Sequence, residues 1–102
     1  MRIAVDAMGG DYAPEEIVLG AIHAAREYDI KITLVGDEDA ILPILNKNDM
    51  AVSERFSVHH ASQVIDMNEA PSTAIRKKKD ASIVVATRLV KEGVCDALVA
   101  PG

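Results

Sequence analysis

Blocks of apolar residues recur along the chain, and their spacing predicts alternating strands and helices. Short, continuous apolar runs are typical of strands that are buried on both faces of a sheet. The predicted strands are residues 2–6, 31–35, 55–60 and 96–100. The predicted helices are residues 14–28, residues 38–46, a short stretch from 71 and a stretch from about 82. Strands that alternate with helices of crossover length indicate an open, mainly parallel α/β sheet with flanking helices.

Polar residues, prolines and glycines mark the ends of the predicted helices. Asp37 is expected to cap the helix that follows it, and Pro43 should interrupt or kink that helix. Asp80 or Ser82 is the expected cap of the last helix, and Gly93 should follow its end. The sequence has no internal repeat or linker, and its 102 residues predict a single α/β unit.

The first predicted strand ends at Asp6 and leads into a turn with two adjacent glycines. In open α/β sheets, ligands bind in the crevice beyond the carboxyl ends of the strands. Glycines there let backbone amides approach a ligand without obstruction from a side chain. The turn is therefore a candidate binding site, although a plain tight turn between strand and helix has the same pattern. Its candidate residues are Asp6, Gly9, Gly10 and Asp11.

The third predicted strand ends in two adjacent histidines, His59 and His60. Adjacent side chains of a strand point to opposite faces, so the two histidines cannot easily share one metal ion, and we predict no metal site. His60 is a candidate for contact with phosphate or substrate, or it is an ordinary strand-terminal histidine. The single cysteine, Cys95, has apolar neighbours and is expected to be a buried thiol.

The composition agrees with a helix-covered parallel sheet. With 49% hydrophobic but only 3% aromatic residues, the core must be built from aliphatic side chains. The net charge of −5 argues against general nucleic-acid binding. Because the N-terminus lacks a signal-peptide pattern and no apolar run approaches the roughly 18 residues of a membrane span, we expect a cytoplasmic protein.

The charge is distributed unevenly along the chain. Residues 1–69 carry 5 basic and 13 acidic side chains, whereas residues 70–102 carry 6 basic and 3 acidic ones. Four of the cations are consecutive, at residues 76–79. Because each residue of a helix turns by about 100°, these four side chains cannot all serve one ligand. Either the run is a solvated surface, or one or two cations hold a phosphate in the crevice while the others attract an acidic partner.

Beyond these general features, particular strings of residues are informative. The most specific is Ile-Ala-Val-Asp-Ala-Met-Gly-Gly-Asp at residues 3–11, followed by Ala-Pro-Glu. This string resembles the opening of the PlsX family, the phosphate acyltransferases of bacterial phospholipid synthesis. Further segments that are similar to this family, in the same order, are residues 34–38, 60–67, 69–82, 89–93 and 96–99. The resemblance therefore extends over essentially the whole chain.

The resemblance implies an activity and a larger fold. It implies transfer of a fatty acyl group from acyl-acyl carrier protein to inorganic phosphate, which forms acyl phosphate without a cofactor. It also implies the N-terminal part of an isopropylmalate-dehydrogenase-like three-layer fold. On this basis the amides of Gly9 and Gly10 would cradle phosphate or the oxyanion. Asp6 and Asp11, which repel phosphate while ionised, would orient a lysine, the turn amides or a water molecule.

The resemblance gives roles to the basic run as well. Lys78 or Lys79 would neutralise charge during the reaction, and Arg76 and Lys77 would attract the acidic carrier protein. His60 would contribute to the same crevice. The family further implies a homodimer in the full-length form and transient association with the inner face of the cell membrane.

At the end of the chain the sequence departs from the family. The family continues its fourth strand with Ser-Ala-Gly-Asn-Thr-Gly-Ala, whereas this chain has Ala100-Pro101-Gly102. The Asn-Thr part of the expected phosphate-binding turn is therefore missing, and Pro101 removes one backbone donor. We expect residues 1–102 to be the N-terminal fragment of a larger domain, with little activity alone.

Three other functions remain open from the sequence. The first is a phosphate acyltransferase that uses coenzyme A thioesters, or another enzyme of the same architecture. The second is a receiver-like module in which Asp6 and Asp11 bind magnesium. It would require an aspartate at the end of the third strand, where this chain has His59 and His60. The third is a non-catalytic module that docks a carrier protein, a membrane surface or phosphate through the basic run.

Overall fold

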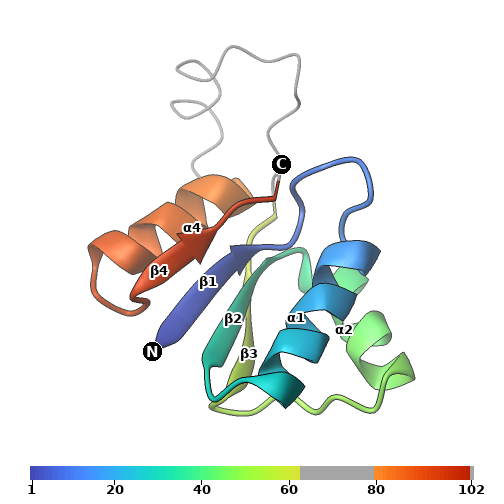
Figure 1. Cartoon of the computed structure of the whole chain (residues 1–102). Coiled ribbons are helices and arrows are strands. Elements are labelled where there is room, and N and C mark those ends of the chain that lie inside the picture. The colour runs from blue at the N-terminus through green and yellow to red at the C-terminus, as the bar shows by residue number, and fades with distance from the viewer. Residues whose placement is uncertain (63–79, 102) are drawn as a thin grey trace.

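The computed structural model describes residues 1–62 and 80–101. Its elements follow the predicted alternation of strands and helices (Figure 1). In chain order they are β1 (Arg2–Asp6), α1 (Glu15–Glu27), β2 (Lys31–Gly36), α2 (Glu38–Lys47), β3 (Phe56–His60), α4 (Ser82–Lys91) and β4 (Ala97–Val99). The short helix predicted from residue 71 and the basic run at residues 76–79 lie outside the described residues.

The four strands form one sheet in the order β3-β2-β1-β4, and every neighbouring pair is parallel. The first strand of the chain therefore lies inside the sheet, between β2 and β4. In the register, Val5 of β1 stands between Leu34 of β2 and Val99 of β4. This arrangement confirms the predicted open parallel α/β sheet with flanking helices. The assignment to an isopropylmalate-dehydrogenase-like fold stays a prediction.

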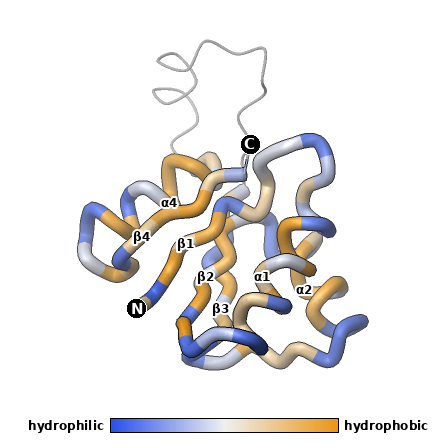
Figure 2. The backbone as a smooth tube through the Cα atoms, in the orientation of Figure 1, coloured by the Kyte–Doolittle hydropathy of each residue, from blue (hydrophilic) through white to orange (hydrophobic). Residues whose placement is uncertain are grey.

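The helices lie on both faces of the sheet. On one face, α1 and α2 pack against a core that includes Val5, Leu34 and Phe56. On the other face, α4 packs against Ala4 and the neighbouring strands. Successive residues of a strand point to opposite faces, which explains why Ala4 and Val5 belong to different cores. The strands are accordingly hydrophobic along most of their length, as Figure 2 shows.

Helix α2 confirms one expectation and corrects another. The side chain of Asp37 caps it by accepting a hydrogen bond from the amide of Asp39 (3.0 Å). However, the helix continues through Pro43 to Lys47, so the expected interruption is wrong. A proline removes one backbone donor. Here the buried side chains of Ile41, before Pro43, and Leu45, after it, hold the helix against the sheet.

The start of helix α4 differs from the prediction. Its N-cap residue is Ala81, which makes no side-chain capping bond, so neither Asp80 nor Ser82 caps the helix. Ser82 is instead the buried first residue of the helix, and the carboxylate of Asp80 binds elsewhere. The expected end is confirmed, because Gly93 follows the helix with a φ of 79°, in the left-handed region that favours glycine.

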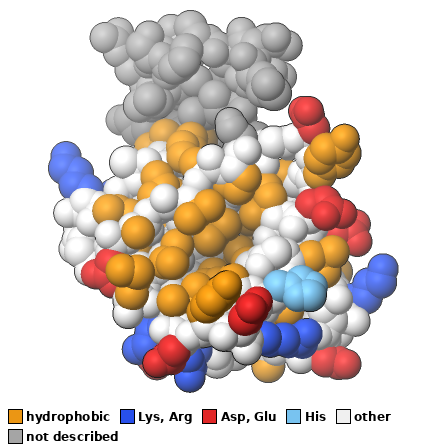
Figure 3. Space-filling model, in the orientation of Figure 1, with side chains coloured by type: hydrophobic (Ala, Val, Ile, Leu, Met, Phe, Trp, Pro, Cys, Tyr) orange, Lys and Arg blue, Asp and Glu red, His pale blue; other side chains and the backbone are white. Residues whose placement is uncertain are grey.

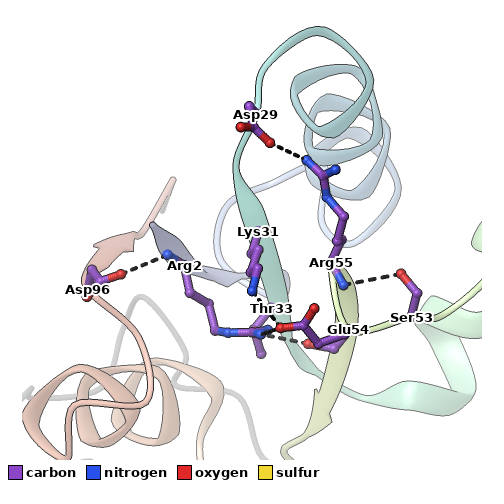
Figure 4. Close-up of polar contacts among 9 residues, drawn as sticks. Arg2, Asp29, Lys31, Thr33, Ser53, Glu54, Arg55 and Asp96 are labelled. Carbon is purple, nitrogen blue, oxygen red and sulfur yellow. Dashed lines mark hydrogen bonds and ion pairs between the residues drawn. The ribbon is translucent and has the colours of Figure 1, made fainter.

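Charged side chains gather at the amino end of the sheet (Figure 4). Glu54 accepts hydrogen bonds from both Arg2 and Lys31, and the amide of Arg2 donates to Asp96 (2.8 Å). The ion pairs here are Arg2–Glu54 (3.4 Å), Lys31–Glu54 (2.6 Å) and Arg55–Asp29 (2.6 Å). The hydrogen bond and charge of Lys31 lower the pKa of Glu54. Nearby, Cys95 is a buried free thiol, as expected.

Candidate functional site

The turn that follows β1 is fixed by the residue that ends the strand. Asp6 is 5% exposed, and its Oδ1 accepts a hydrogen bond from the amide of Met8 (3.0 Å). The amide of Ala7, between Asp6 and Met8, donates to the carbonyl of Val35 in β2 (2.9 Å). A side chain that binds an amide two residues ahead makes an Asx turn, which directs the chain out of the strand. Asp6 therefore shapes the turn through a direct contact with one of its amides.

The paired glycines lie beyond this contact. Gly10 has a φ of 90°, which a residue with a Cβ adopts only with strain. Gly9, Gly10 and Asp11 all border one groove at this end of the sheet. The four residues predicted from the sequence for this turn thus come from one continuous segment, with Asp6 buried at its start and Asp11 exposed at its end.

A further glycine supports the turn, although sequence reasoning treated it only as the end of a strand. At Gly36, the last residue of β2, a Cβ would lie 2.6 Å from Cγ of Met8 and 3.1 Å from Cδ1 of Ile41. The distance to Met8 is well inside van der Waals contact, so a larger residue at this position would have to displace the Met8 side chain. The one signal in the sequence was a glycine directly after an apolar strand, which is also typical of an ordinary turn.

His60 lies at the carboxyl end of β3, where its role is partly structural. Its Nδ1 accepts a hydrogen bond from the amide of Glu38 (3.2 Å), in the first turn of α2. In a neutral imidazole whose Nδ1 accepts, the proton is on Nε2. Strand β2 separates β3 from β1, and two strand spacings amount to about 10 Å. The structure therefore does not bring His60 into the glycine turn.

Ser62 and Asp80 form a contact that the sequence did not indicate. The carboxylate of Asp80 accepts hydrogen bonds from both the amide (2.8 Å) and the hydroxyl (2.5 Å) of Ser62. These two bonds, with smaller contributions from the charges of His60 and Arg88, lower the pKa of Asp80. The contact joins residues that are 18 positions apart and fixes the start of α4 to the loop after β3.

An apolar groove of about 490 Å³ extends from the glycine turn along the face of the sheet that carries α1. Its walls come from β1, β2, β4 and α1, and include Ile3, Val5, Val99, Ile17 and Ala24. Figure 3 shows hydrophobic side chains gathered on this face. The groove thus places an apolar surface directly beside the glycine turn.

The four cations of the basic run, Arg76, Lys77, Lys78 and Lys79, fall outside the described part of the chain, so their roles stay predictions. Within residues 1–62 and 80–101, no three His, Cys, Asp or Glu side chains come together as metal ligands would. Over the same residues, no helix has the length and apolar character needed to cross a membrane.

Comparison with known proteins gives the site a context. Residues 1–102 match a family model described as "Fatty acid synthesis protein". The chain belongs to this family. It is 61% identical to the phosphate acyltransferase of Heliobacterium modesticaldum, 53% to that of Desulfitobacterium hafniense (strain DSM 10664 / DCB-2) and 46% to that of Oceanobacillus iheyensis. Each alignment covers 100% of the chain but only 29–30% of the relative.

These matches confirm the resemblance to phosphate acyltransferases that the opening string indicated. In this member of the fatty acid synthesis protein family, the glycine turn, the end of β2 and the groove adjoin one another at the carboxyl edge of the sheet. The chain spans about 30% of the length of the curated relatives that it matches.

Proposed function

We propose that the chain is the N-terminal third of a phosphate acyltransferase. The enzyme would transfer a fatty acyl group from acyl-acyl carrier protein to inorganic phosphate. The observation that carries this proposal is the match of the whole chain, at 46–61% identity, to proteins named phosphate acyltransferase. The glycine turn supports it, because its amides lie at the sheet edge where α/β proteins bind anions and other ligands.

The proposed reaction has one addition and one elimination. A phosphate oxygen attacks the thioester carbonyl carbon, and the carbonyl oxygen becomes the oxyanion of a tetrahedral intermediate. The C–S bond then breaks, which yields acyl phosphate and the carrier-protein thiol, with the proton from phosphate balancing the thiolate. Amides of Gly9 and Gly10 would stabilise phosphate or the oxyanion. Asp6 would act through the turn, since it already accepts a hydrogen bond from the amide of Met8.

Charge balance gives the basic run a role in this proposal. The described ends of β1 and β2 carry carboxylates at Asp6, Asp11 and Asp37, which would repel a phosphate. Cations are therefore needed nearby, and we assign that role to Lys78 or Lys79. Arg76 and Lys77 would attract the acidic carrier protein. The Ser62–Asp80 contact supports this, because both ends of the segment with the run meet beside β3.

The remaining parts of the proposal concern the setting of the enzyme. The intact protein would be a cytoplasmic homodimer that associates transiently with the inner membrane surface. It would need no cofactor. His60, whose Nδ1 is occupied by the amide of Glu38, would contact substrate through Nε2. Substitution His60→Asn, whose Oδ1 can accept from that amide in place of Nδ1, should then lower activity without a comparable loss of stability.

The test is an assay of the intact protein with acyl-acyl carrier protein and radiolabelled inorganic phosphate. We expect carrier-protein thioester to be consumed only when phosphate is present, with label appearing in acyl phosphate. Acyl-CoA should be inert under the same conditions. Equal or faster turnover of acyl-CoA would instead support the coenzyme A alternative. If neither thioester yields acyl phosphate, the proposed activity is wrong.

A further inference from the structure

One face of the sheet is covered unevenly. On the α4 face, Ala4 of β1 and Leu98 of β4 pack within a core. On the α1 face, the neighbouring residue Val99 is 47% exposed, and Tyr12, at the groove, is 77% exposed. Figure 3 shows this face of the molecule with its hydrophobic side chains open to view. A parallel sheet is normally covered on both faces, so the groove beside α1 is a surface that requires an occupant.

Helix α1 presents small residues to this groove. Gly20, Ala21 and Ala24 line it at the spacing of one helix face, together with Ile17. Glycine is less favourable than alanine inside a helix, yet a Cβ at Gly20 would meet no atom within 4 Å. The described residues therefore give no packing reason for glycine at this position. Small residues on a helix surface allow a second helix to approach closely.

The direction of the crossovers limits which element can fill the groove. The connections from β1 to β2 and from β2 to β3 run one way across the sheet, with α1 and α2 on one face. The connection to β4 runs the opposite way, and α4 lies on the other face. Right-handed crossovers produce this exchange of faces. A strand added beside β4 would thus place its crossover helix on the α4 face, away from the groove.

We propose that the groove is the docking surface for a helix from a later part of the same polypeptide, which returns to the α1 face and packs its apolar side across Gly20. The inference rests on the proposal that the chain is the first third of a longer protein. About 70% of each curated relative lies beyond the aligned part, which is ample length for such a helix. A returning helix would bury the strand face permanently, whereas a substrate would leave it exposed to water between turnovers.

The test is thiol labelling of the intact protein. Ala24→Cys places a thiol in the groove, and Glu15→Cys places a matched thiol on the opposite, exposed side of the same helix, since each residue turns by about 100°. Unsubstituted protein, with its buried Cys95, gives the background. We expect Ala24→Cys to react with a maleimide about 100-fold more slowly than Glu15→Cys, since labelling of a covered site requires local opening. Val99→Cys, on the opposite wall, provides a second position if Ala24→Cys does not fold.

Three results would overturn the proposal. Equal rates at the groove and control positions would show that the groove is open. Protection that appears only after a long-chain acyl phosphate is added would make it an acyl-chain site. Protection that disappears on dilution would assign it to a second copy of the chain. None of these readouts depends on turnover. An inactive protein whose groove thiols are protected would therefore contradict the proposed activity but not the proposed docking of a helix.

Discussion

Charged side chains have different kinds of partners at the two ends of the sheet. At the amino end, Arg2 and Lys31 are paired with Glu54, so opposite charges meet within the described chain. At the carboxyl end, the carboxylate of Asp6 accepts a hydrogen bond from a backbone amide, and that of Asp80 accepts from an amide and a hydroxyl. Ion pairs between side chains predominate at the amino end, although the carboxylate of Asp96 there also accepts from the amide of Arg2, whereas both carboxylates at the carboxyl end bind backbone amides. A backbone fixed in this way can present its own amides to a ligand.

The largest effect should come from changing the glycine turn. In the intact protein, Gly10→Ala should lower kcat about 100-fold, as loss of an oxyanion donor does in other enzymes. The physical reason is the φ of 90°, which alanine adopts only by distorting the turn. The measurement is phosphate-dependent acyl phosphate formation under saturating substrate.

Gly93 offers a matched control for that substitution. It also has a positive φ, of 79°, but it follows α4 and has open space around it. Gly93→Ala should therefore introduce similar backbone strain while leaving kcat nearly unchanged. If both substitutions lower kcat equally, strain alone explains the loss and the turn has no special role.

The second effect concerns how Asp6 acts. Asp6→Ala should destabilise the protein by about 2 kcal/mol, because the amide of Met8 loses a charged acceptor. Asp6→Asn keeps an oxygen in the same place and should retain most of the stability. Urea denaturation of both variants measures this difference. Activity that survives in Asp6→Asn would assign Asp6 to positioning, whereas activity lost in a stable Asp6→Asn variant would contradict that assignment.

A smaller effect is the difference between the two ends of the sheet in how salt changes the pKa of their carboxyl groups. The pKa of Glu54 is lowered chiefly by Lys31, and that of Asp80 chiefly by hydrogen bonds from Ser62. Because salt screens charges more than it weakens such hydrogen bonds, added salt should raise the pKa of Glu54 more than that of Asp80. Carbon-detected NMR titration of the two carboxyl groups at low and high salt measures this. Equal shifts would remove the distinction between the two ends.

The same lowered pKa values fix the sign of the pH dependence. A carboxyl whose folded-state pKa is lowered contributes fully to stability above its ordinary pKa, which is 3.8 for Asp80 and 4.5 for Glu54. The contribution is lost as the pH falls below that value and through the lowered pKa. Asp80→Asn should therefore flatten the decline of stability in this acidic range. An unchanged pH profile would mean that Asp80 has no lowered pKa in the folded state.

The smallest effect is expected at the amino end. Glu54 is an exposed partner of Lys31 and Arg2, and exposed ion pairs contribute little to stability. Glu54→Gln should shift the urea midpoint much less than Asp6→Ala does. A larger shift than that of Asp6→Ala would reverse the ranking of the two ends.

Much of the fold follows from the sequence because buried parallel strands leave a strong pattern. The bounds of β1 agree with the prediction, β2 extends one residue further than predicted, and α1 is one residue shorter at each end. The predicted N-cap of α4 was wrong for a specific reason. Asp80 has the right residue type and position for a cap, but Ser62, 18 positions earlier, offers its carboxylate two donors instead.

The candidate site could be predicted only in part. Residues of one turn, from Asp6 to Asp11, are neighbours in the sequence, and the turn was found from its glycines. The groove and the contact between Gly36 and Met8 depend on which strands become neighbours, and no local pattern specifies that. His60 was placed correctly at a strand end, but its distance from the turn follows from the strand order.

The position of β1 inside the sheet has a consequence for synthesis on the ribosome. Translation proceeds towards the C-terminus, so β1 and its turn emerge before β2, β3 and β4. One edge of β1 can pair as soon as β2 has emerged, but the other edge waits for β4, and the amide of Arg2 bonds a residue 94 positions later. Contacts so distant in sequence form slowly. The turn therefore remains beside an unpaired strand edge until β4 has emerged, which makes this edge a natural target for chaperones.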